Sequence, residues 1–100
     1  MITFARVAAV APDKGNEAMA FAHQAVKMVA DKVGKKVSIS MPIGGNPWRF
    51  LWVSTYENLA EFESTTTKLM ADADYLKLLN SSGAYFIPGS THDELWIGIE

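Results

Sequence analysis

The stretch NPWRFLWVSTYEN, residues 46–58, constrains the fold of this chain more than any other part of the sequence. It reads as a β-strand, in which successive side chains point to opposite faces of a sheet. One face would carry Trp48, Phe50, Trp52, Ser54 and Tyr56, and the other Arg49, Leu51, Val53 and Thr55. Because both faces are substantially apolar, such a strand requires cover on both sides.

The remaining composition is that of one ordinary globular domain, residues 1–100. Hydrophobic residues make up 49% of the chain and charged residues 20%. A net charge of −2 gives no basic surface for nucleic acid, and the absence of cysteine excludes disulfides and thiolate metal sites. No apolar run approaches the roughly 20 residues that span a bilayer, and Arg6 interrupts the apolar start of the chain. We therefore expect a cytoplasmic protein without membrane or nucleic-acid partners.

Hydrophobic periodicity and turn residues predict the order strand, helix, strand, strand, helix, strand. Gly34 is expected to cap the first helix, and Asn58, with Glu61 three residues later, has the pattern of a capping box at the start of the second. The expected elements are a strand over 2–10, a helix over 16–33, a hairpin of 37–43 with the aromatic stretch, a helix after residue 58, a break at 72–74, a short helix over 75–80 and a strand over 91–99.

This order is that of a ferredoxin-like βαββαβ unit, an α+β fold with a four-stranded antiparallel sheet and both main helices on one face. Because helices favour aliphatic surfaces, we expect the aliphatic side of the sheet to lie beneath them. That side would hold Ala5, Val7, Ala9, Val37, Ile39, Leu51, Val53, Leu95, Ile97 and Ile99. The other side would hold Phe4, Arg6, Ser38, Ser40, Trp48, Phe50, Trp52, Ser54, Tyr56, His92, Glu94 and Trp96.

This assignment depends on the length of one hairpin loop. An odd loop, residues 44–46, places the serines with the aromatic rings, whereas a four-residue loop would place Val37, Ile39 and Met41 there. We favour the odd loop. Four large aromatic side chains on an open face would then expose on the order of 600–1000 Å², and burying them would release about 15–25 kcal/mol before ordering costs. We therefore expect two chains to pack their aromatic faces together as a homodimer.

The element order, the segment WVSTYENLAEFE and the late turn and strand PGSTHDELW together resemble the dimeric α+β barrel superfamily. That superfamily includes antibiotic-biosynthesis monooxygenase-like and NIPSNAP-like small proteins. The resemblance spans nearly the whole chain and implies a sheet-to-sheet homodimer that encloses or flanks a small-molecule cavity. Haem-degrading relatives have a histidine on the second helix, and this sequence has none there, so haem chemistry is not expected.

The candidate catalytic residues lie on the first and last strands. His92 and Glu94 share a predicted strand face, and Arg6 on the neighbouring strand is expected to pair with Glu94. In the catalytic interpretation His92 is a general base, Glu94 orients it and Arg6 binds an anion or oxyanion. In the structural interpretation Arg6 and Glu94 form an ion pair inside the dimer, and His92 lies in solvent. The predicted substrate-binding residues are Phe4, Ser40, Phe50, Trp52, Tyr56 and Trp96, which alternatively form packed core.

Other polar groups favour structural roles. His23 lies on the polar side of the first helix, and Asp72 and Asp74 lack the spacing of a calcium loop. We expect no cofactor and no metal. Two functions remain open. One is a homodimer that binds a small aromatic or lipophilic molecule, with cofactor-independent monooxygenation or isomerisation as its chemistry. The other is a noncatalytic dimerisation or ligand-sensing module with a filled interior.

Overall fold

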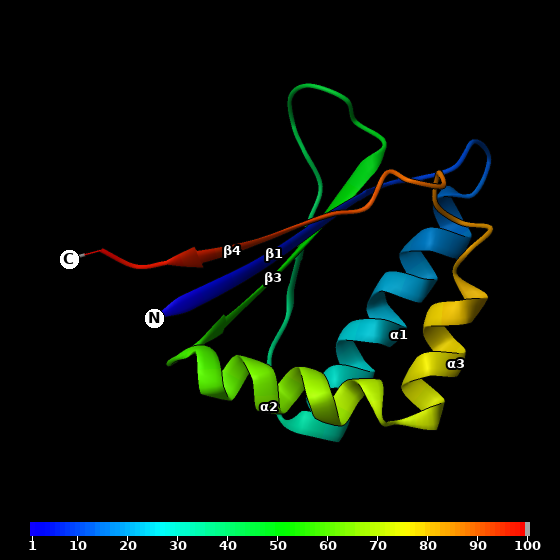
Figure 1. Ribbon diagram of the computed structural model, residues 1–100. Coiled ribbons are helices and arrows are strands. Elements are labelled where there is room, and N and C mark those ends of the chain that lie inside the picture. Colours follow the sequence, from blue (N-terminus) through cyan, green and yellow to red (C-terminus); the bar gives the residue numbers. More distant parts are fainter. Residues whose placement is uncertain (100) are drawn as a thin grey trace.

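The computed structural model describes residues 1–99 and consists of a four-stranded antiparallel sheet with its helices on one side (Figure 1). The strand order is β2-β3-β1-β4, which confirms the predicted ferredoxin-like α+β fold. The elements are β1 (Ile2–Ala9), α1 (Gly15–Val33), β2 (Ser38–Ser40), β3 (Arg49–Tyr56), α2 (Leu59–Met70), α3 (Ala73–Ser81) and β4 (His92–Ile97). No helix within residues 1–99 has the length and apolar character needed to cross a membrane.

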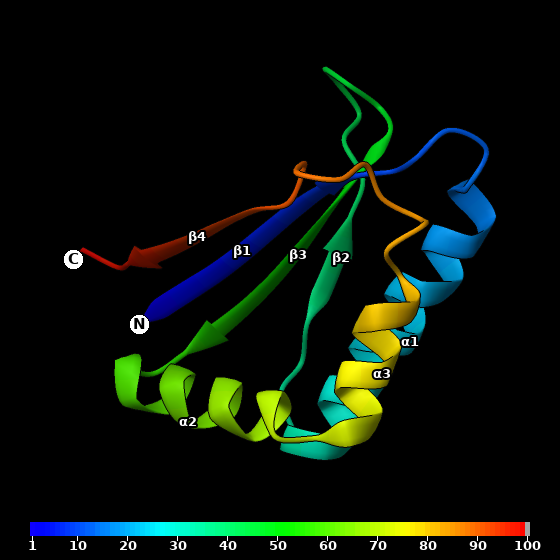
Figure 2. The same ribbon diagram turned by 45° about the vertical axis from the view of Figure 1, so that its right-hand side comes forward.

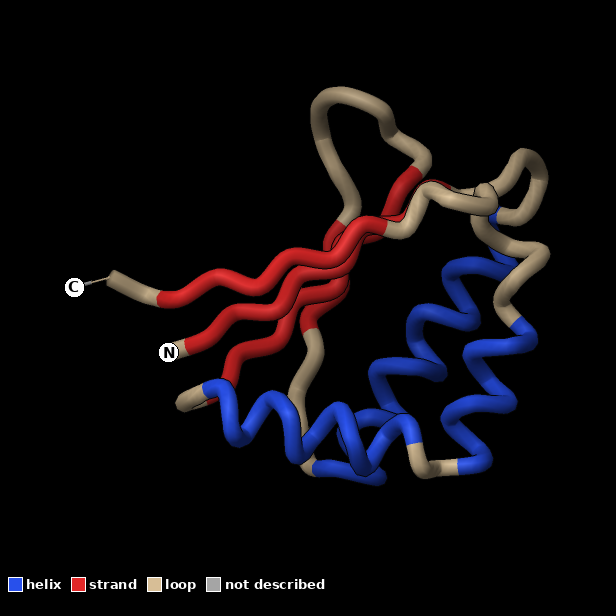
Figure 3. Tube along the Cα trace, in the orientation of Figure 1, coloured by secondary structure: helices blue, strands red, loops and turns tan. Residues whose placement is uncertain are grey.

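The helices form one layer. α1 and α3 lie side by side, and α2 crosses near the C-terminal end of α1 (Figures 1 and 2). The opposite side of the sheet has no layer from residues 1–99 (Figure 3). One face of the sheet is therefore covered within the chain, and the other is open.

Local sequence signals set the helix boundaries. Gly34 ends α1 in the left-handed conformation with a φ of 67°. The Asn58 side chain accepts a hydrogen bond of 2.9 Å from the backbone N–H of Glu61, as the capping box predicts. Asp72 accepts the N–H of Tyr75 in the same way and begins α3 directly after α2. The predicted helices and their break are thus confirmed.

The hairpin differs from its prediction in length and in parity. β2 ends at Ser40 rather than at residue 43, and the next residues include Pro42, which has no N–H to donate to a sheet. The connection 41–48 has an even number of residues, and Ile39 stands opposite Trp52. The expected loop with an odd number of residues is therefore wrong. The number is even, as in the four-residue alternative, and Ile39 lies on the same face as Trp52.

The register of β1 and β3 groups Phe4 and Arg6 with the aromatic side chains of β3, as expected, but this face lies toward the helices and not away from them. Arg6 stands opposite both Trp52 and Asp93, and Ala5 stands opposite Val53 and Glu94. The helix-facing side holds Ile2, Phe4, Arg6, Ala8, Ile39, Phe50, Trp52, Ser54, Tyr56, Asp93, Leu95 and Ile97. The open side holds Thr3, Ala5, Val7, Ala9, Ser38, Ser40, Leu51, Val53, Thr55, His92, Glu94 and Trp96. The aromatic rings of β1 and β3 thus face the chain's own helices, whereas Trp96 of β4 lies on the open side.

The interior consists of two separate hydrophobic clusters. The first contains Val10, Ala18, Ala22 and Phe50, with Trp52 packed against it. The second joins the three helices through Val29, Leu69 and Tyr75. Large rings such as Phe50 and Trp52 therefore lie between sheet and helices together with smaller aliphatic side chains.

Candidate functional site

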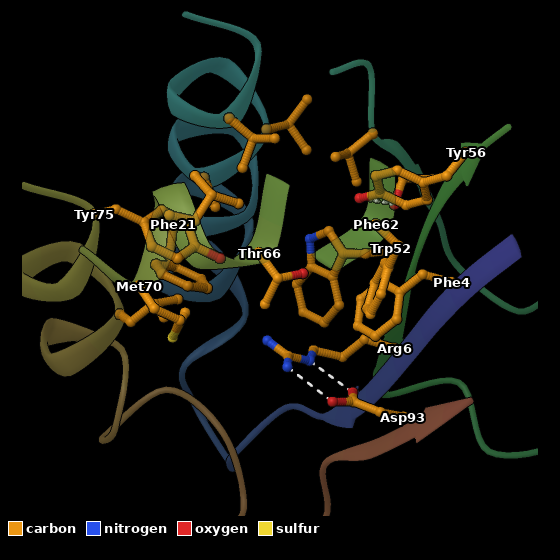
Figure 4. A pocket seen from close by; sticks show the side chains of 17 residues that line it. Phe4, Arg6, Phe21, Trp52, Tyr56, Phe62, Thr66, Met70, Tyr75 and Asp93 are labelled. Atoms are coloured by element: carbon orange, nitrogen blue, oxygen red, sulfur yellow. Dashed lines mark hydrogen bonds and ion pairs between the residues drawn. The ribbon is translucent and has the colours of Figure 1, made fainter. Parts of the chain in front are cut away.

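A cavity of about 250 Å³ lies between the sheet and the helices (Figure 4). Side chains from β1, β3, β4 and all three helices line it. Six of these side chains are aromatic: Phe4, Phe21, Trp52, Tyr56, Phe62 and Tyr75. Small-molecule sites are typically concave, mostly apolar and lined by a few polar groups, with volumes from about 300 Å³ upward. The cavity has this character, and its volume lies slightly below that range.

Contacts between rings hold the walls of the cavity. The rings of Phe4 and Phe62 are 5.5 Å apart, and Tyr56 meets Phe62 edge to face at 5.2 Å. Trp52 meets Phe50 edge to face at 6.0 Å. In Figure 4 Trp52 stands between the group of Phe4, Phe62 and Tyr56 and the helical side chains on the other side. A flat ligand could therefore stack on Trp52 without displacing a core side chain.

The charged groups of the cavity form one ion pair. Arg6 Nε and Nη2 donate to the two carboxylate oxygens of Asp93 at 2.7 and 2.8 Å. The two side chains are 37% and 41% exposed, so the pair lies where the cavity meets solvent. The hydrogen bond that Arg6 donates to Asp93 raises the pKa of Arg6 above its usual value. The Arg6 guanidinium also lies 5.6 Å from the centre of the Phe4 ring, within the range of a cation–π contact.

Hydroxyl groups supply the remaining polarity. Ser54 and Tyr56 are joined by a buried hydrogen bond of 3.1 Å between their oxygens. Tyr75 lines the other side of the cavity. Burial is the main cause that raises the pKa of Tyr75, and the positive charge of Arg6 acts against it. The Tyr75 hydroxyl therefore stays protonated at neutral pH and can act as a hydrogen-bond donor.

The structure divides the predicted site residues between the two sides of the sheet. Phe4, Arg6, Trp52 and Tyr56 line the cavity, and Phe50 lies beside them in the first hydrophobic cluster. Ser40, His92, Glu94 and Trp96 belong to the open side. The prediction that all of these residues share one face of the sheet is wrong. The even number of residues in the connection 41–48 places Ser40 on the open side, and the register of β4 places His92, Glu94 and Trp96 there.

The predicted pair of Arg6 with Glu94 is also wrong. Arg6 stands opposite Asp93, and adjacent residues of a strand point to opposite faces. Sequence reasoning missed Asp93. A usable signal existed, because alternation along the strand places Asp93 on the same face as Leu95 and Ile97, which are expected on the helix side.

The predicted neighbours His92 and Glu94 do meet on the open side. His92 Nε2 lies 2.8 Å from one Glu94 carboxylate oxygen, and the Trp96 indole N–H donates to the other at 2.9 Å. The His92 hydrogen bond, followed by that of Trp96, lowers the pKa of Glu94. A catalytic role for His92 and Glu94 stays a prediction. Within residues 1–99, no three His, Asp or Glu side chains are grouped as a metal site.

The fold defines a ferredoxin-like α+β protein with a cavity between its sheet and its own helices. A NIPSNAP domain protein from Burkholderia xenovorans superposes with a TM-score of 0.83 at 10% identity, over 99% of this chain and 95% of the other. Protein Atu4242 from Agrobacterium tumefaciens gives 0.82 at 12% identity, over 99% and 94%. An antibiotic biosynthesis monooxygenase-like protein from Nitrosomonas europaea gives 0.76 at 15% identity, over the full length of both chains.

These structures share the ferredoxin-like α+β fold of this chain, and they include NIPSNAP and antibiotic biosynthesis monooxygenase-like proteins, as the resemblance predicted. No family model and no curated protein matches the sequence. Because a fold supports many chemistries, function has to be argued from the cavity itself.

Proposed function

We propose that this protein binds a small, flat and largely apolar molecule in the cavity between its sheet and its helices, and that it does so as a homodimer. The single observation that supports the binding proposal is a cavity of about 250 Å³ whose aromatic walls converge on one ion pair. Protein interiors are close-packed and have few voids larger than a water molecule. A filled, purely structural interior would not have this space.

The position of the three tryptophans allows a direct test of binding. Trp52 lines the cavity, whereas Trp48 precedes β3 and Trp96 lies on the open side of the sheet. On addition of 1-naphthol we expect the indole N–H signal of Trp52 to shift in a nitrogen–proton NMR spectrum. The signals of Trp48 and Trp96 serve as internal controls. If Trp52 stays unchanged at millimolar 1-naphthol and at similar concentrations of other flat phenols, the binding proposal is refuted.

The homodimer is proposed from the open side of the sheet. That side carries the small and branched side chains Ala5, Val7, Leu51 and Val53, together with Trp96, which is 60% exposed. Such side chains permit two sheets to pack face to face at about 10 Å. The proposed interface is thus the aliphatic side of β1 and β3 and not the aromatic side expected from the sequence.

The dimer is tested by placing a charge in the centre of this surface. Val53→Lys would bury an unpaired ammonium group in a sheet-to-sheet contact, so we expect the variant to sediment as a single chain. Ala30→Lys, on the exposed side of α1, is the matched control and should leave the dimer intact. A wild-type protein that sediments as a single chain at micromolar concentration contradicts the dimer proposal.

The monooxygenase-like fold neighbour favours a second, catalytic proposal, the oxygenation of a bound phenol by O₂ without a cofactor. The substrate supplies the electrons. One oxygen atom enters the ring as a quinone carbonyl, and the other leaves as water with the two hydrogens lost from the phenol. Arg6 would hold the phenol oxygen through N–H groups that Asp93 does not use. His92 and Glu94 face the proposed dimer interface, and their catalytic role is a separate proposal tested by His92→Ala.

The test is oxygen consumption with 1-naphthol as substrate. We expect one O₂ to be consumed for each 1,4-naphthoquinone formed, with a lower rate in Arg6→Gln. Binding of 1-naphthol without any oxygen uptake would reject catalysis and leave the binding proposal in place.

A further inference from the structure

We infer that the cavity selects electrically neutral ligands, because Asp93 already neutralises Arg6 where the cavity opens to solvent. This inference rests on the proposed binding function and specifies the chemical class of the ligand. An unpaired arginine in an aromatic cavity would indicate an anionic ligand, and the sequence alone suggested that reading. Because Arg6 pairs with Asp93, the cavity does not present an unpaired positive charge to an anionic ligand.

The charge of the cavity wall sums to zero. Among the described residues that line the cavity, Arg6 and Asp93 are the charged ones, and they carry opposite signs. Their contact is bidentate, with donor–acceptor distances of 2.7 and 2.8 Å. This geometry occupies the Nε/Nη2 edge of the guanidinium, one of the two edges that can bind a carboxylate bidentately, and places a negative charge beside the other. A carboxylate ligand would have to displace Asp93 or lie next to its negative charge.

A neutral oxygen meets no such obstacle. An arginine has five N–H donors, and the two bonds to Asp93 leave others available. The hydroxyls of Thr66 and Tyr75 line the same cavity. Figure 4 shows Arg6 and Asp93 together at one edge of the ring-lined space, with the carboxylate on the side of β4. A phenol or ketone could therefore stack on Trp52 and direct its oxygen toward these donors.

The pairing register of β1 and β4 determines which carboxylate neutralises the charge of Arg6. Asp93 is held opposite Arg6 by the antiparallel pairing of β1 and β4. Because both side chains are partly exposed, water screens the charge that would remain if one partner were removed. An uncompensated charge at such a site is expected to change the affinity for an ionic ligand about fivefold, the upper range for exposed pairs.

The experiment measures three ligands of similar shape by calorimetry at pH 7 and low salt. 1-Naphthol is neutral, 1-naphthoate is an anion and 1-naphthylmethylamine is a cation. Wild-type protein should bind 1-naphthol at least about fivefold more tightly than either ion. Asp93→Asn should raise the affinity for 1-naphthoate about fivefold, and Arg6→Gln should do the same for the ammonium ligand. The double variant should again prefer 1-naphthol.

Asp31→Asn is the matched control, since it makes the same chemical change on the exposed side of α1. It should leave the order of the three affinities unchanged. Wild-type protein that binds 1-naphthoate as tightly as 1-naphthol overturns the inference, and so does an Asp93→Asn variant with the wild-type preference. If Asp93→Asn does not fold, the wild-type comparison still decides. Absence of binding by all three ligands instead overturns the proposed function.

Discussion

Ala25 offers the sharpest test of whether the cavity is a binding site. It lies on α1 one helical turn from both Phe21 and Val29, and all three residues line the cavity. Ala25→Leu would place three further carbon atoms in the space that we assign to the ligand. Leucine is a good helix former, so the substitution costs the helix itself little. The change therefore acts mainly on the cavity.

The expected gain in stability follows from the atoms added. At about 0.8 kcal/mol per buried methylene, three carbon atoms contribute about 2 kcal/mol. Fixing the leucine rotamer costs about 0.5–1 kcal/mol. A net gain of about 1–1.5 kcal/mol remains, which corresponds to a rise in Tm of about 5–10 °C for a domain of this size. Affinity for 1-naphthol should fall in the same variant, because the ligand and the leucine occupy the same space.

The assay is thermal unfolding and calorimetric titration of the same samples at one protein concentration, since dimer formation would make Tm depend on concentration. Ala30→Leu, an exposed position on the same helix, is the control and should change stability by less than about 0.5 kcal/mol. The reasoning is refuted if Ala25→Leu destabilises the protein. It is equally refuted if the variant is more stable and still binds 1-naphthol with wild-type affinity.

Three further predictions concern the fold around the site. Asn58→Ala should lower the free energy of unfolding by about 1 kcal/mol in urea, whereas Asn58→Asp should retain the cap. Phe50→Ala should cost about 3–5 kcal/mol, since Phe50 is 2% exposed in the first hydrophobic cluster, and a loss below 1 kcal/mol would contradict that placement. Hydrogen bonds from the Tyr75 N–H, and then from Lys32, lower the pKa of Asp72. The ionised Asp72 therefore stabilises the folded state at pH values above the pKa that this carboxyl has in the unfolded chain. This stabilisation is lost as pH falls through the pKa of the folded state, which is lower. Asp72→Asn, which can still cap α3, should therefore lose less stability than wild type on acidification from pH 5. An equal loss of stability in urea unfolding would contradict the lowered pKa of Asp72.

Much of the fold could be predicted because its signals are local. The Asn58 cap, the left-handed Gly34 and the break at Asp72 each depend on contacts within a few residues of sequence. The element order then limits the topology, and the observed strand order agrees with it. Such features require no knowledge of how the sheet packs.

The composition of the site could not be predicted, because it depends on register. One residue more or less in the connection 41–48 exchanges the two faces of β2 relative to β3. The rule that aliphatic side chains lie beneath helices also failed for β1 and β3, where Phe4, Trp52 and Tyr56 face the helices and line the cavity. Once Arg6 faces the helices, its partner has to come from the same side of β4, which makes it Asp93 and not Glu94.

The strand that supplies Asp93 is an edge strand of the sheet and borders the cavity. β4 has β1 as its neighbour among the described strands, and all six of its residues are exposed. Edge segments with exposed backbone bonds unfold locally at a lower free energy than interior strands. Amide protons of β4 should therefore exchange with solvent sooner than those of β1 and β3. Each such opening would separate the Asp93 carboxylate from Arg6. If the cavity binds a ligand as we propose, the rate at which this edge strand opens would then limit how fast the ligand enters and leaves.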